Sequence, residues 1–141
     1  ATATAKMPDV LKMIAASGTL VAGTTGDTIT LTDVRANSIL SFSAIDAGKV
    51  DKVIHWNADK IDVSGFDFAT AAESVVTITG MTQQVKTTTA GFFHGAGVAI
   101  EKVGADSWVY VDSDHNGNFN PTTDVTIHVV GATVVAGDVL F

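Results

Sequence analysis

The amino-acid sequence predicts a mainly β fold, either an antiparallel β-sandwich or a short β-solenoid-like domain, with one short N-terminal helix. Segments rich in Val, Ile, Thr and aromatic residues alternate apolar and polar positions, and turn signals separate them roughly every 8 to 12 residues. Hydrophobic residues make up 46% of the 141 residues, which is enough to bury a core in a single domain.

The N-terminal part differs from the rest, so we expect an arm and a short helix in residues 1–18 and a β-rich domain in residues 19–141. The opening Ala-Thr-Ala-Thr-Ala fits either an edge strand or a loose arm. A helix is predicted over Met7–Ser17, because Pro8 suits a first turn and Gly18 can end the helix. The apolar stripe of this helix would consist of Val10, Leu11, Met13 and Ile14.

The β-rich domain contains a series of apolar or alternating segments that we expect to form strands. In chain order they are Leu20–Val21, Thr28–Thr32, Ser38–Ala44, Val50–Trp56, Asp59–Phe68 (with a turn at Ser64-Gly65), Val75–Thr79, Val98–Val103, Trp108–Val111, Val125–Val130 and Val134–Phe141. Gln83–Thr89 fits either an exposed strand or a loop, and Ala69–Ser74 fits a turn or a single helical turn. Gly91–Gly97 predicts a glycine-rich turn that is anchored by two phenylalanines.

The segment Asp106–Gly131 predicts two strands joined by an acidic loop that is rich in Asn and Gly. Side-chain oxygens recur at every second position of this loop, and one more aspartate follows it. These candidate metal ligands are Asp112, Asp114, Asn116, Asn118, Asn120 and Asp124. Ca²⁺ takes six to eight oxygen ligands, and a tight loop of this composition can supply several of them. The loop therefore indicates a Ca²⁺ site.

The opening Asp-x-Asp-x-Asn-Gly is shared with EF-hand loops, but the chain departs from that motif. Thr123 stands where the bidentate Glu is expected, and no flanking helices are visible in the sequence. A second interpretation is a plain polar hairpin turn, since Asp, Asn and Gly are also favoured turn residues.

Charge and composition argue against several classes of function. The formal net charge is −7 and the eight basic residues are scattered, which argues against nucleic-acid binding and favours divalent cations. The chain has no cysteine, so disulfides and thiolate sites are excluded. No apolar run approaches the roughly 20 residues of a membrane span. A charged fraction of only 16% suits β-rich extracellular proteins better than cytosolic enzymes.

No catalytic constellation is visible in the sequence, and we expect the protein not to be an enzyme. The histidines share no metal-ligand spacing; they are His55, His94, His115 and His128. Neither Ser17-Gly18 nor Ser64-Gly65 has the pattern of a nucleophile elbow. Three further aromatic residues fit either stacking on a sugar or a place in the core; they are Trp56, Trp108 and Tyr110.

Several segments resemble the C-terminal region of RTX-type bacterial proteins, which are exported by type I secretion. Asp51–Phe66 resembles a segment of that region, and DKIDVSG is its most telling part. Ser107–Gly117 resembles the acidic hairpin of the family and Val125–Gly131 its next strand. Asp138–Phe141 resembles its acidic-then-apolar last residues. The same elements occur in secreted metalloproteases, surface-layer proteins and adhesins of Gram-negative bacteria.

Two departures limit what this resemblance implies. Tandem glycine-rich Ca²⁺ repeats are missing, apart from one degenerate copy at Gly23–Ile29. The His-Glu-x-x-His motif of the protease relatives is also missing. What the resemblance implies is a noncatalytic, β-rich end piece that carries an uncleaved export signal.

Three functions remain open at this point. The first, which we predict, is an extracellular or cell-surface structural protein of a Gram-negative bacterium. Type I secretion machinery would export it, and it would self-assemble as a homo-oligomer or polymer, in a layer or filament stabilised by Ca²⁺. The second is a C-terminal export and capping module of a larger secreted enzyme or toxin. The third is a carbohydrate-binding module.

Overall fold

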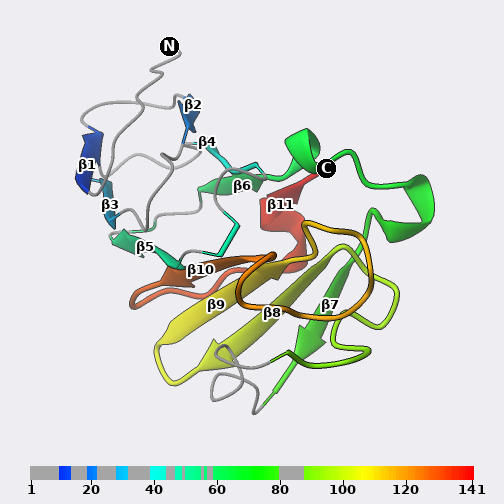
Figure 1. Cartoon of the computed structure of the whole chain (residues 1–141). Helices are drawn as coiled ribbons and strands as arrows, with labels where there is room; N and C mark the ends of the chain where they lie inside the picture. The colour runs from blue at the N-terminus through cyan, green and yellow to red at the C-terminus, as the bar shows by residue number, and fades with distance from the viewer. Residues whose placement is uncertain are drawn as a thin grey trace.

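The computed structural model describes residues 10–13, 19–21, 28–31, 39–43, 47–48, 50–54, 56, 59–79 and 88–141. The strands in these ranges form two sheets (Figure 1). The large sheet consists, in spatial order, of β1 (Val10–Met13), β3 (Thr28–Leu31), β5 (Val50–Ile54), β10 (Val125–Val129), β9 (Asp106–Val111), β8 (Val98–Val103) and β7 (Val75–Ile78). The small sheet consists of β11 (Val139–Leu140), β6 (Lys60–Asp62), β4 (Ile39–Ser41) and β2 (Thr19–Val21).

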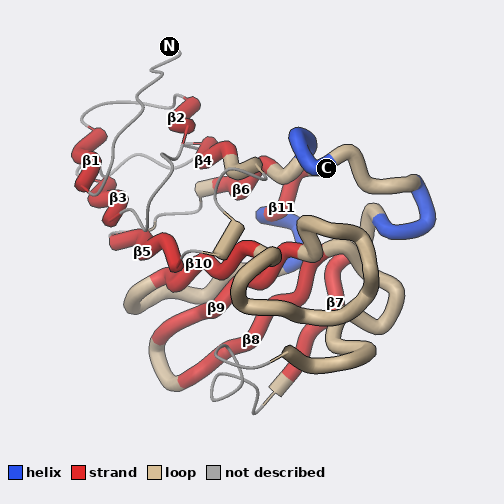
Figure 2. Tube along the Cα trace, in the orientation of Figure 1, coloured by secondary structure: helices blue, strands red, loops and turns tan. Residues whose placement is uncertain are grey.

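Short 3₁₀ turns are the only helical elements in the described part of the chain (Figure 2). They are η2 (Ser64–Phe66), η3 (Thr70–Ala72) and η5 (Ala136–Asp138). The first two follow β6 and lead to β7, and the third leads into β11. The mainly β fold that the sequence predicts is therefore confirmed, and Ala69–Ser74 does contain a single helical turn.

The first six strands alternate between the two sheets along the chain. β1, β3 and β5 pair in parallel in the large sheet, while β2, β4 and β6 pair in parallel in the small sheet. Each pair of successive strands therefore adds one strand to each sheet, parallel to the strand before it in that sheet. This arrangement is that of a short β-solenoid, in which successive coils of the chain stack on one another.

The last two strands continue the same stacking after an excursion of the chain. β10 pairs in parallel with β5, and β11 pairs in parallel with β6. In the sequence, β7, β8 and β9 come between β6 and β10; in the sheet, they lie beyond β10 and extend it. Pairing is antiparallel only between β8 and β9 and between β9 and β10, and it is parallel between all other paired strands that are described.

The main core lies between the two sheets, and we call it the inner core. Alternate residues of the large sheet, such as Val53, Val109 and Ile127, are fully buried against the small sheet. Leu40 and Ile61 face them from β4 and β6. This alternation is the one that the sequence pattern indicates, because successive side chains of a strand point to opposite faces.

A second cluster, the outer core, covers part of the opposite face of the large sheet. Its buried members are Ile78, Phe92, Phe93, Ala99, Tyr110 and Phe119. Phe92 contacts Tyr110 and Phe119 at ring-centroid distances of 5.0 and 5.1 Å. The two phenylalanines of the Gly91–Gly97 turn thus anchor it on β8 and β9, as the sequence predicts. Val98–Glu101 of β8 and Val109–Val111 of β9 are consequently buried on both faces.

The predicted N-terminal helix is wrong over the residues that the structure describes. Val10–Met13 forms strand β1, which pairs with β3 from Val10–Thr28 to Met13–Leu31. The apolar spacing of this segment fits a helix as well as a strand, and an isolated helix of this length gains little stability in water. Pairing with a distant strand therefore decides the conformation. The remainder of the predicted helix and the opening arm lie outside the described residues.

Candidate metal centre

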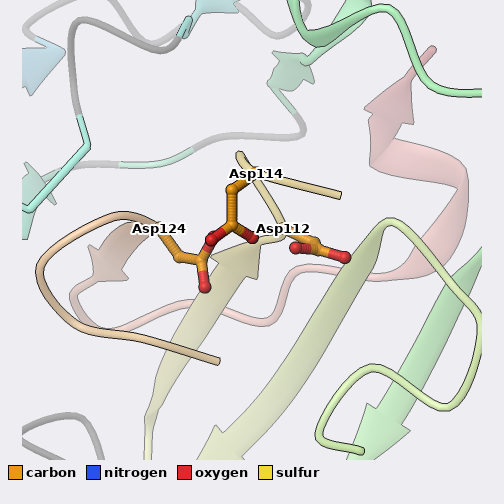
Figure 3. Close-up of side chains that lie close together, drawn as sticks. All are labelled: Asp112, Asp114 and Asp124. Carbon is orange, nitrogen blue, oxygen red and sulfur yellow. The ribbon is translucent and has the colours of Figure 1, made fainter. Parts of the chain in front are cut away.

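The acidic loop joins β9 to β10, and strand pairing brings its two ends together. Val111 is the last residue of β9 and pairs with Val125, the first residue of β10. Asp112 and Asp124 are the next residues outward on each strand, so the antiparallel ladder places them beside one another. The loop between them carries Asp114 back over the same end of the hairpin (Figure 3).

Three carboxylates meet at this end of the hairpin. One carboxylate oxygen from each of Asp112, Asp114 and Asp124 lies within 4.8 Å of the others. Asp112 and Asp124 are buried, and Asp114 is exposed. Figure 3 shows the carboxylates of Asp114 and Asp124 turned toward one another, with that of Asp112 beside them. We call these three residues the aspartate cluster.

The two buried carboxylates are oriented by backbone amides of the loop itself. Gly117 N–H donates to Asp112 Oδ2 at 2.9 Å, and Asn116 N–H donates to Asp112 Oδ1 at 3.2 Å. Asp124 Oδ2 accepts from Asn120 N–H at 2.7 Å, and its Oδ1 accepts from Ser113 N–H at 2.9 Å. The backbone of the loop therefore surrounds these two carboxylates and holds them in place. Neither carboxylate belongs to an ion pair with a basic side chain among the described residues.

The asparagines that alternate with the aspartates have a different arrangement. Asn116 Nδ2 donates to Asp114 Oδ2 at 2.9 Å, and its Oδ1 accepts from Asn118 N–H at 2.8 Å. Asn118 Oδ1 accepts from Gly91 N–H, and Asn120 Oδ1 accepts from Thr122 N–H, both at 2.9 Å. Of the six candidate ligands, the structure gathers the three carboxylates, while the amide oxygens of the three asparagines bond to backbone N–H groups.

Burial and mutual repulsion raise the proton affinity of the buried pair. Burial, together with the smaller effect of the nearby charges of Asp114 and Asp112, raises the pKa of Asp124 to about 6, against the opposing effect of the hydrogen bonds from Asn120 and Ser113. Burial is also the main cause of a raised pKa for Asp112. A bound cation would reverse this effect, because an opposite charge at short distance favours the ionised carboxylate.

The donor set suits a hard cation. Oxygen ligands lie about 2.3–2.6 Å from Ca²⁺, so two of them on one ion are at most roughly 4.6–5.2 Å apart. The separation within the aspartate cluster satisfies this condition. No histidine or cysteine belongs to the cluster, so the nitrogen and sulfur ligands that zinc prefers are missing from it. The residues present therefore fit Ca²⁺.

A neighbouring loop before β5 is attached to the same hairpin. Gly48 N–H donates to the carbonyl oxygen of Asp124 at 2.9 Å. Gly48 has a φ of +75°, and a Cβ at this position would lie 2.8 Å from the carbonyl oxygen of Thr122. Only glycine fits both the backbone conformation and the close approach. The aspartate cluster is thereby linked to the β5 coil.

A cavity of about 360 Å³ lies next to Asp112, and sequence reasoning missed it. Asp112, His115 and Asn116 form its polar side, and Phe68 contributes to its apolar side. The rings of Phe68 and His115 are 4.9 Å apart. The cavity depends on the packing of the η2–η3 segment against the loop, and these segments are far apart in sequence.

The remaining sequence candidates lie in separate places. Tyr110 is buried in the outer core and donates to Glu101 at 3.1 Å, and burial raises its pKa. Trp108 stacks on His128 with ring centroids 4.0 Å apart, and His128 also contacts Asp106 at 2.8 Å. Trp56 packs against the inner core. The three cavities that are described are lined by residues other than these aromatic side chains.

Within the described residues, no helix has the length and apolar character that crossing a membrane requires. Comparison with known proteins finds no matching family model, no matching curated protein and no matching solved structure. The geometry of the chain itself is therefore the basis for a functional proposal.

Proposed function

We propose that the chain is a noncatalytic structural subunit, which a Gram-negative bacterium exports by type I secretion. Outside the cell, Ca²⁺ fills the aspartate cluster and the subunit self-assembles. The single observation that carries the calcium part of this proposal is the meeting of three carboxylates within 4.8 Å at the end of the β9–β10 hairpin. The resemblance to RTX-type proteins supports the route of export.

The cluster can act as a switch because it lies at a junction of the fold. β10 pairs with β5 on one side and with β9 on the other, so it joins the stacked coils to the β7–β9 extension. At the low Ca²⁺ concentration of a cytosol, repulsion between Asp112, Asp114 and Asp124 opposes closure of the loop. At millimolar extracellular Ca²⁺, the ion neutralises the cluster and stabilises the closed hairpin.

Mass action sets the size of this effect. A ligand that binds only the folded state stabilises it by about 2.7 kcal/mol at a hundredfold excess over its Kd. Extracellular calcium modules have Kd values of about 10⁻⁴–10⁻³ M, so a few millimolar Ca²⁺ gives part of that stabilisation. The stabilisation of the closed hairpin by Ca²⁺ therefore sets in between the Ca²⁺ concentrations of the two compartments.

The proposal is tested by light scattering and negative-stain electron microscopy in about 5 mM Ca²⁺, enough to fill a weak extracellular site, and in EDTA. Ordered sheets or filaments that form with Ca²⁺ and dissolve in EDTA are the expected result. Identical particles in both conditions would contradict a calcium-ordered subunit. Asp112→Ala is expected to abolish the calcium response, and an unchanged response would remove Asp112 from the proposed site.

One observation favours a second candidate, the C-terminal capping module of a larger secreted protein. Among the described strands, the stacked coils run from β1 and β2 to β10 and β11, and β7–β9 extend the large sheet beside the last coil. Solenoids need terminal units that differ from the stacked coils and cover their last face. A chain that remains monomeric in both Ca²⁺ and EDTA would favour this candidate over the first.

A further inference from the structure

Strand β7 forms one end of the large sheet. It pairs in parallel with β8 from Val75–Val98 to Ile78–Glu101, and β8 is its only neighbour among the described strands. The N–H and C=O groups on the other side of a terminal strand can pair with a further strand. This edge is therefore a candidate contact surface.

β7 lacks the features with which proteins usually prevent pairing between sheet edges. The segment Ser74–Thr79 reads Ser-Val-Val-Thr-Ile-Thr, with high β-propensity and without charge or proline. Of the other terminal strands, β1 carries Lys12, β2 has only three residues and β11 only two. Val75 and Val76 are half-buried, and Thr77 and Thr79 are exposed. Among the described residues, the outer edge of β7 thus pairs with no other strand and carries no charge that would oppose pairing.

The residue pattern of β7 is complementary to itself. If two copies pair antiparallel about a twofold axis at Thr77, Val76 of each copy lies opposite Ile78 of the other. The same register places Thr77 opposite Thr77 and Val75 opposite Thr79. β-Branched residues in such cross-strand pairs stabilise a sheet, and no like charges meet. A twofold interface needs this self-complementarity.

A cavity lies beside the same strand. Its volume is about 310 Å³, and Ile78, Ala90 and Phe92 form its apolar wall, with Thr77 and Thr79 at the edge of the sheet. Val76 and Ile78 lie on the face of the large sheet that carries the outer core. In the register above, Val76 of a second copy lies opposite Ile78 and can fill this space. Pairing would therefore join the outer cores of two copies.

We propose that β7 is a dimerisation edge, at which a second copy of this chain pairs antiparallel through residues 75–79 and joins the two large sheets into one. The inference rests on the proposed function, since it names one contact of the proposed self-assembly. It uses none of the aspartates, so this contact forms in EDTA as well as in Ca²⁺. Calcium then controls higher assembly rather than this pairing.

The first test measures mass in EDTA by light scattering coupled to gel filtration. We expect the native chain to have twice its monomer mass of 14.5 kDa. Thr77→Lys places a charge on an exposed position of the edge and should halve the measured mass, whereas Thr133→Lys, at an exposed position outside the strands, should leave it unchanged. A monomeric native chain, or an unchanged mass for Thr77→Lys, overturns the inference.

The second test uses the lack of cysteine in the chain. Thr77→Cys places two thiols opposite one another across the twofold axis, at a Cα separation of about 4.5–5.5 Å, where a disulfide can form. Mild oxidation should convert this variant to a covalent dimer at least tenfold faster than Thr133→Cys. Equal rates overturn the inference. Because both tests run in EDTA, their failure is distinct from a missing response to Ca²⁺, which would contradict the proposed function instead.

Discussion

Neutralising Asp114 should change the stability of the protein in opposite directions with and without calcium. Asp114 is the exposed member of the aspartate cluster, and its carboxylate raises the pKa of both Asp112 and Asp124. Asp114→Asn keeps the shape of the side chain and one oxygen acceptor but removes the charge. Without metal, the variant should be more stable than the native chain, because two repulsive interactions are weakened.

The size of this effect follows from the geometry. At the upper limit of 4.8 Å for the separation within the cluster, two unit charges repel by about 0.9 kcal/mol in water and about 3.5 kcal/mol at an effective dielectric constant near 20. Since Asp114 is exposed, the value in water is the better guide for each of its two neighbours. We therefore expect a gain of about 1–2 kcal/mol at pH 7.5, which corresponds to a rise in Tm of about 3–6 °C for a chain of this length.

Thermal unfolding followed by circular dichroism, in EDTA and in about 5 mM Ca²⁺, measures both directions. The native chain should be stabilised by Ca²⁺, and Asp114→Asn should lose most of that stabilisation because one charged ligand is gone. Asp67→Asn is the matched control, because it removes the same charge from an exposed residue outside the cluster and should change stability by less than about 0.5 kcal/mol. A lower Tm for Asp114→Asn in EDTA, or an undiminished calcium response, would refute the electrostatic argument.

Three further predictions follow from the site and the cores. The pKa of Asp124 is about 6, so the ionised fraction falls from about 0.9 at pH 7 to about 0.09 at pH 5, and titration calorimetry should show a roughly tenfold loss of apparent Ca²⁺ affinity. A pH-independent Ca²⁺ affinity would exclude Asp124 as a ligand. Because the folded-state pKa of Asp124 lies above the ordinary 3.8, this group also makes the metal-free protein more stable as pH falls from about 7 toward 4. Gly48→Ala should destabilise the protein more than Gly104→Ala in urea unfolding, since both glycines have positive φ but only the first would bring its Cβ within 3 Å of another atom; equal effects would contradict the close approach to Thr122. Phe119→Ala should cost about 3–5 kcal/mol in urea unfolding, because this ring is fully buried among Phe92, Phe93 and Tyr110, and a cost below 1 kcal/mol would show that the outer core is not packed as described.

The sequence alone determines where most of the strands after residue 18 and the acidic loop lie. Strands β7, β8, β9 and β10 fall within two residues of the segments expected from the pattern of β-branched and aromatic residues. The direction of pairing is not encoded in that pattern, because alternation of side chains is the same in parallel and antiparallel strands. The parallel coils therefore emerge only from the tertiary structure. The N-terminal segment shows the same limit, since its apolar spacing fits a helix and its pairing with β3 makes it a strand.

The candidate site shows a similar division. The alternating side-chain oxygens in the sequence indicate a loop that can bind a cation. This pattern does not distinguish the aspartates from the asparagines as metal ligands. Pairing of Val111 with Val125 brings Asp112 and Asp124 together, and backbone N–H groups of the loop orient their carboxylates. Other backbone N–H groups donate to the side-chain oxygens of the asparagines. The raised pKa values depend on burial, and the cavity beside Asp112 depends on Phe68 from a distant segment. Composition and spacing thus determine the chemistry that is present, whereas long-range packing decides which groups meet and how strongly they bind a proton or a metal ion.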